Sequence, residues 1–169
     1  MTKKLIILLL AIAPIAAFAQ NAKLAHINTS ELFNQMPEIP GIETQLNTKQ
    51  EEISKNGQAL VDEFNKKAEE FQKLAPTSSE TVKADQQKQL DQINERYQMF
   101  LQNSQREMEE LRQKLLAPVQ QKIATAIKAV GDEKGYTYIF DLAAGNPVYF
   151  NATTAEDATP LVKTKLGIK

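Results

Sequence analysis

The stretch that decides the fold is IETQLNTKQEEISKNGQALVDEFNKKAEEFQKL, residues 42–74. Its apolar side chains recur every eleven residues, as in Ile42, Ile53 and Phe64. Eleven residues fill three turns at slightly more than the roughly 3.6 residues per turn of a straight α-helix, so the apolar stripe stays nearly parallel to the helix axis. The pattern predicts one continuous helix over 42–74, roughly 50 Å long.

The same spacing returns after one interruption at APTSS, residues 75–79. Beyond it, the spacing connects Val82, Ile93, Ser104 and Leu115. The proline of the interruption ends the first helix, and Ser78 or Ser79 can cap the next one. The second helix is predicted over 80–134, with Gly135 as its C-cap. Two apolar stripes of this kind predict a long antiparallel helical hairpin, coiled-coil-like, with its tip near 75–79.

Pro118 lies inside the predicted return helix. A proline there removes one backbone hydrogen bond and clashes with the carbonyl four residues earlier, so we expect a kink near Lys114. At this point we place the boundary between a helical arm, residues 42–114, and a body made of residues 20–41 and 115–169.

The segments on either side of the hairpin predict a small β-containing body. Residues 23–28 are predicted as a strand and residues 31–36 as a short helix capped by Thr29 or Ser30. Downstream, two strands over 136–142 and 147–150 are expected to form a β-hairpin, and Thr154 with Asp157 resembles a capping box that opens a last helix. The fold class is therefore α+β and mostly α, with the helical hairpin inserted in a body that both ends of the chain must build.

Residues 1–19 are predicted to be a secretory signal peptide cleaved after Ala19. They combine two lysines, a short apolar run and the small-x-small ending of residues 17–19. The chain has no cysteine, which excludes a lipid anchor on that residue and disulfide stapling. We expect a soluble periplasmic protein without a stable membrane anchor.

Without Lys3 and Lys4 the mature chain carries 18 basic and 21 acidic residues, a net charge of −3. This balance argues against nucleic acid as a partner. The basic cluster of the return helix is formed by Arg96, Arg106, Arg112 and Lys114. Glutamates are interspersed among them, so a solvated mixed face is favoured over an anion site.

Three groups of residues resemble the Skp/OmpH-like periplasmic chaperones. They are KLAHIN at 23–28 with Leu32-Phe33, AIKAV at 126–130 leading to YIFD at 138–141, and Val148-Tyr149 before the last helix. The resemblance implies a homotrimer with one shared β body and three arms around a cavity, which holds unfolded outer-membrane proteins without ATP. The better-known members are strongly basic, so no lipopolysaccharide site is carried over to this acidic chain.

A pair of helices can cover only the stripes that face each other, so bulky apolar residues of the arm remain for other contacts. The candidates for client binding are Phe64, Phe71, Leu74, Tyr97, Met99, Phe100 and Leu101. The candidates for the oligomer interface are Leu24, Ile27, Tyr138, Ile139, Phe140, Val148 and Phe150. The alternative for the first group is that most members lie in the hairpin seam or in trimer contacts.

No catalytic residue, metal site or cofactor is expected. The chain has one histidine, His26, without a ligand cluster around it in the sequence, and no serine lies in a glycine-rich elbow. Two function classes remain: a holdase for unfolded outer-membrane proteins, and a structural or assembly adaptor whose hairpin docks on a fixed envelope partner. A hydrolytic enzyme is a weak third.

Overall fold

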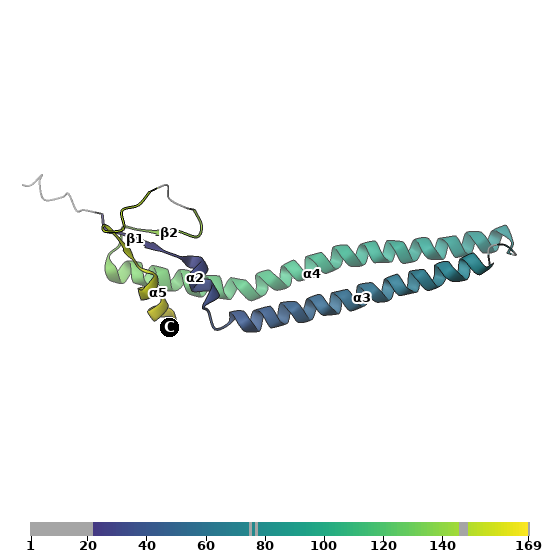
Figure 1. Cartoon of the computed structure of the whole chain (residues 1–169), viewed down its shortest axis with the longest axis horizontal. Coiled ribbons are helices and arrows are strands. Elements are labelled where there is room, and N and C mark those ends of the chain that lie inside the picture. Colours follow the sequence, from purple (N-terminus) through teal and green to yellow (C-terminus); the bar gives the residue numbers. More distant parts are fainter. Residues whose placement is uncertain (1–21, 75, 77, 146–148, 169) are drawn as a thin grey trace, which may run out of the picture. The chain divides into compact units, whose positions relative to one another are not determined.

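The computed structural model describes residues 22–74, 76, 78–145 and 149–168. The predicted signal peptide lies outside them. In chain order the elements are β1 Leu24–Ile27, α2 Thr29–Asn34, α3 Ile39–Leu74, α4 Glu80–Lys134, β2 Tyr138–Asp141, β3 Ala155–Asp157 and α5 Thr159–Leu166 (Figure 1). The described chain divides into two compact units: residues 36–121, and residues 22–35 with 122–168. The α+β, mostly α fold class is confirmed.

The first unit contains α3 and residues 80–121 of α4, which form the predicted antiparallel helical hairpin. Helix α4 has the predicted bounds, and Gly135 follows it with a left-handed φ of 67°, as expected of a C-cap. Helix α3 ends at Leu74 as predicted but begins at Ile39, three residues early. Pro40 is tolerated there because amides of a first helical turn have no intrahelical partner. At the tip, the Ser79 hydroxyl accepts a hydrogen bond from the Val82 N–H at 3.4 Å, which makes Ser79 the cap.

Contacts across the hairpin establish its antiparallel register. Glu63 pairs with Arg96, and Lys49 pairs with Glu107 at 3.1 Å, so rising numbers on α4 meet falling numbers on α3. The seam contains the buried α4 residues Leu90, Ile93 and Ser104. The last two are eleven residues apart, as the spacing predicts. Pro118 lies within α4 without interrupting the helix, and the expected kink near Lys114 stays a prediction.

The second unit contains a three-stranded sheet in the order β2-β1-β3, with both pairs parallel. The predicted hairpin of two antiparallel strands is wrong. Residues 149 and 150 are not in a strand, residues 146–148 lie outside the described chain, and the third strand is Ala155–Asp157. Parallel strands need a long connection. A local turn signal after Leu142 therefore could not reveal that both later strands pair with β1.

The predicted capping box is wrong for the same reason, because Asp157 belongs to β3. Its carboxylate accepts a hydrogen bond from the Thr159 N–H at 2.9 Å. Helix α5 begins at Thr159, four residues later than the capping box predicts. Helix α5 ends at Leu166, and Gly167 caps it with a left-handed φ of 72°. The predicted strand over 23–28 and the short helix after it are both present, but α2 begins at Thr29 and Asn28 caps it. Asparagine is a strong N-cap residue.

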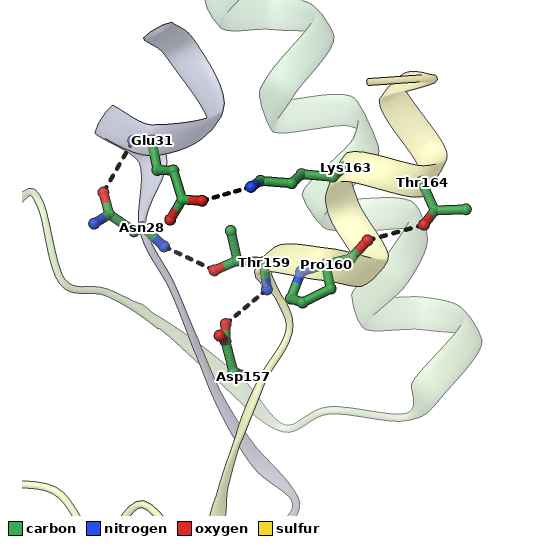
Figure 2. Close-up of polar contacts among 7 residues, drawn as sticks. All are labelled: Asn28, Glu31, Asp157, Thr159, Pro160, Lys163 and Thr164. Atoms are coloured by element: carbon green, nitrogen blue, oxygen red, sulfur yellow. Dashed lines mark hydrogen bonds and ion pairs between the residues drawn. The ribbon is translucent and has the colours of Figure 1, made fainter. Parts of the chain in front are cut away.

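Contacts between the two ends of the chain hold this unit together (Figure 2). The Asn28 N–H donates to the Thr159 hydroxyl at 3.2 Å, and the Lys163 ammonium pairs with Glu31, so α2 and α5 are joined. On the strand side, the Thr29 N–H and hydroxyl both donate to Asp141. Buried apolar residues of this unit are Ala25, Ile27, Leu32, Ile123, Ala126, Val130, Ala155, Ala158 and Val162. The expectation that both ends build the body is confirmed.

Candidate functional site

The hairpin leaves large apolar side chains exposed on both of its helices. Phe64 and Leu74 of α3 are 37% and 46% exposed, and Met99 of α4 is 57% exposed. Leu101 is also exposed, and Val82 near the tip joins them although sequence reasoning missed it. The eleven-residue spacing identifies Val82 as a residue of the apolar stripe, but it does not show that the side chain is exposed.

Two of the predicted client residues meet in a hollow between α3 and α4. The hollow has a volume of about 160 Å³. Its lining residues are Leu60, Val61, Phe64, Ile93, Asn94 and Tyr97, and we call it the apolar hollow. Phe64 and Tyr97 were predicted, whereas the other four were missed. The spacing identifies Leu60 and Ile93 as stripe residues, but only the pairing register shows which side chains face one another.

Phe100 belongs to the seam. A side-chain Cβ on Gly57 would lie 3.2 Å from the Phe100 ring, so the absence of a side chain at Gly57 gives the ring its place against α3. Phe71 is half-buried. For Phe100, therefore, the seam alternative is the better interpretation.

Met99 is separated from Tyr97 by the geometry of the helix. Residues two apart in an α-helix point about 200° away from each other, so Met99 lies on the far side of α4 from Tyr97. The same spacing separates Arg96 from Asn94, which places the ion pair with Glu63 on the Met99 side. Leu101, four residues after Tyr97, shares a face with it. The two flanks of the hairpin thus differ: an ionic flank with Arg96 and Met99, and an apolar flank with the hollow and Leu101.

Pairing fixes the charge state of the ionic groups. The largest cause that lowers the pKa of Glu63 is a hydrogen bond from Arg96. The same bond is the largest cause that raises the pKa of Arg96. The pKa of Lys49 is raised, and the largest cause is its hydrogen bond with Glu107. These groups are therefore fully charged at neutral pH and compensate one another across the hairpin. Arg96 is thus engaged with a carboxylate, in accord with the mixed face expected of the return helix.

The sheet of the second unit has an open aromatic face. Tyr138 and Phe140 are 61% and 49% exposed, and their rings lie 6.2 Å apart. Beside them is a pocket of about 360 Å³. It is lined by Leu24, His26, Phe140, Leu142, Tyr149, Phe150, Asn151, Thr154 and Ala155. Tyr149, 81% exposed, was not among the interface candidates although it is part of the family resemblance.

The predicted interface residues divide between this face and the core. Leu24, Phe140 and Phe150 line the pocket, and Tyr138 is exposed next to it. Ile27 is 2% exposed, and the Ile139 side chain lies close to Gly131 of α4, so both pack within the chain itself. Val148 lies outside the described residues.

His26 packs against Phe150, with ring centroids 4.8 Å apart. Within the described ranges, no three histidine, cysteine, aspartate or glutamate residues are placed to hold a metal ion. None of the helices in the described part of the chain combines the length and apolar character that crossing a membrane requires.

Comparisons with known proteins agree with this architecture. The family described as outer membrane protein (OmpH-like) matches residues 23–166. The chaperone protein Skp of Yersinia enterocolitica is 30% identical over 133 residues, which cover 76% of this chain and 79% of the relative. Skp of Pectobacterium atrosepticum is 26% identical over 139 residues, 80% of this chain and 82% of the relative.

A solved structure of an OmpH-like outer membrane chaperone from Caulobacter crescentus shares the fold. Its TM-score is 0.69 with 18% sequence identity, over 86% of this chain and 83% of that one. At this identity the likeness concerns the fold alone. The family match extends over nearly all of the described chain, and the relatives align over most of their own length. This chain therefore belongs to the OmpH-like family, which includes the Skp chaperones.

Proposed function

We propose that this protein is an ATP-independent holdase of the periplasm that binds unfolded outer-membrane β-barrel proteins and prevents their aggregation. Membership of the OmpH-like family and the similarity to Skp chaperones support a chaperone role. The observation that carries the proposal is the set of apolar side chains that the hairpin leaves exposed. Phe64, Leu74 and Leu101 are among them.

Such a surface suits sequence-tolerant binding. Exposed apolar groups that lie apart along a long hairpin offer many weak contacts, and their sum through multivalency can hold a chain without a fixed partner shape. The mutually paired charges of the ionic flank keep the hairpin soluble without attracting one sign of charge. No step in this scheme needs a nucleotide, a cofactor or a nucleic acid.

We further propose that three chains assemble through the sheet. Strands β2 and β3 are both edges of a three-stranded sheet, and unpaired edges of this kind favour pairing with another chain. The exposed aromatic face of Tyr138, Phe140 and Tyr149 would be covered in the same assembly. A homotrimer would place three hairpins around one client, in a protein exported by the signal peptide of residues 1–19.

The test is suppression of aggregation. A urea-denatured outer-membrane β-barrel protein is diluted into buffer with the mature protein and no nucleotide, and light scattering is followed. We expect suppression that saturates near about three chains per client, as one trimer per client requires. Undiminished scattering with a folded protein would instead favour the adaptor, which binds one envelope partner stoichiometrically.

A further inference from the structure

The apolar hollow has the size of a single side chain. Its volume is about 160 Å³, and an apolar cavity of about 150 Å³ is large enough to take up benzene. A phenyl ring or a branched aliphatic side chain therefore fits, but a folded element does not. We propose that the apolar hollow is a subsite that receives one bulky apolar side chain of an unfolded polypeptide. This inference rests on the proposed function and names the part of an unfolded client that the hairpin recognises.

The lining of the hollow defines the chemistry of its occupant. Five of the six residues are apolar or aromatic, and none carries a formal charge. A charged side chain placed there would lose hydration without gaining an opposite charge, so the hollow selects against it. The sixth residue, Asn94, makes no side-chain hydrogen bond to another described residue. Its amide has both a donor and an acceptor for the backbone of an extended segment.

The hollow opens on the apolar flank of the hairpin. Asn94 and Arg96 point about 200° apart on α4, so the hollow opens away from the ion pair between Arg96 and Glu63. A client segment held there lies along the apolar flank, where Leu101 continues the surface one turn beyond Tyr97. Met99, the most exposed of the predicted client residues, lies on the ionic flank. The subsite therefore predicts that Met99 contributes little although it is exposed.

The test compares two variants that each introduce one tryptophan. Val61→Trp places an indole in the hollow, and Met99→Trp places the same group on the ionic flank. Affinity is measured by fluorescence anisotropy of a labelled, urea-denatured outer-membrane β-barrel protein after dilution. We expect Val61→Trp to raise the Kd about tenfold, because burial of one client side chain is lost. Met99→Trp should change the Kd by no more than about twofold, as an ordinary surface substitution does.

The outcomes separate the subsite from the proposed function. Equal Kd values for both variants and the wild type overturn the subsite and leave the holdase standing. Absence of client binding by the folded wild type overturns the holdase itself. If Val61→Trp changes the sedimenting mass in the absence of client, the hollow is occupied by another copy of the chain, which also overturns the subsite. Helix content by circular dichroism confirms that each variant is folded.

A second measurement needs no variant. Methyl NMR spectra of the wild-type protein are recorded with a soluble unstructured peptide that contains one phenylalanine, and with the same peptide carrying alanine instead. We expect the phenylalanine peptide to shift the methyl signals of Leu60, Val61 and Ile93. Equal shifts with both peptides, or shifts confined to Met99, contradict the proposal.

Discussion

Asp141→Asn tests how the sheet is held to the start of the chain. The Asp141 carboxylate ends β2 and accepts three hydrogen bonds. They come from the Thr29 N–H at 3.1 Å, the Thr29 hydroxyl at 2.5 Å and the Ala143 N–H at 3.0 Å. The first two connect residues 112 apart in the sequence, and the third shapes the turn after the strand. The carboxylate therefore fixes the position of the strand that presents Tyr138 and Phe140.

Asparagine keeps one acceptor oxygen but presents an amide donor in place of the other. At least one hydrogen bond to a charged group is then lost, which costs about 2 kcal/mol in the free energy of unfolding. Thr29→Val removes only the hydroxyl donor and should cost about 1 kcal/mol. Because the two residues share a hydrogen bond, the double variant should lose less than the sum of the single losses.

The effect should depend on pH in a definite direction. Burial raises the pKa of Asp141, but the hydrogen bonds from Thr29 and Ala143 outweigh it, so the pKa lies below its ordinary value of 3.8. A carboxyl with a lowered folded-state pKa stabilises the fold above its unfolded-state pKa, and this stability is lost as the pH falls through the folded-state value. The advantage of the wild type over Asp141→Asn should therefore be full at neutral pH and shrink below about pH 4.

The assay is urea unfolding followed by tyrosine fluorescence, at one fixed protein concentration because assembly contributes to stability. The chain has no tryptophan, and three of its four tyrosines lie at residues 136, 138 and 149, in the second unit. A loss below about 0.5 kcal/mol at neutral pH, the size of an ordinary surface substitution, would refute the reasoning. A difference that stays constant from neutral pH to pH 3 would refute the charge argument.

Three further predictions concern the hairpin and the sheet. Gly57→Leu should displace the Phe100 ring, because even a Cβ at this position would lie 3.2 Å from it. The variant hairpin should therefore melt at a lower temperature than the wild type. An unchanged melting curve would show that the seam tolerates the side chain. Phe140→Asp should reduce the sedimenting mass without loss of helix content, since the ring is exposed on the proposed interface; a variant that still sediments as a trimer would contradict that interface. Pro118→Ala should remove the kink expected near Lys114 and lengthen the maximum dimension in small-angle X-ray scattering, whereas identical scattering would count against the kink.

The helices could be predicted because their signal is local and long. The eleven-residue spacing identified the apolar stripe of each helix. Pro76, Ser79 and Gly135 marked where the helices end or begin. The early start of α3 was missed because Pro40 reads as a helix stop in the sequence, although it is tolerated in the first turn.

The sheet could not be predicted in the same way because its pairing is non-local. Strand β3 has three residues, too few for a periodic signal, and it is defined by parallel pairing with β1. Asp157 therefore looked like part of a cap. The sequence did show that both ends of the chain meet, since a single short strand cannot form a sheet alone.

The sequence predicted several residues of the candidate site but not which of them lie together. Phe64 and Tyr97 meet in the apolar hollow, whereas Phe100 lies in the seam. Their meeting depends on the register between α3 and α4, which no single helix contains. The separation of Met99 from Tyr97 depends on helical phase alone and could have been derived from their spacing of two residues.

The most direct measurement is sedimentation velocity of the mature protein mixed with a labelled outer-membrane β-barrel protein diluted from urea, without nucleotide. The holdase proposal predicts one soluble complex that contains the client and saturates at about three chains per client. A client that pellets, or that sediments alone at every ratio although the protein itself is folded, would contradict it.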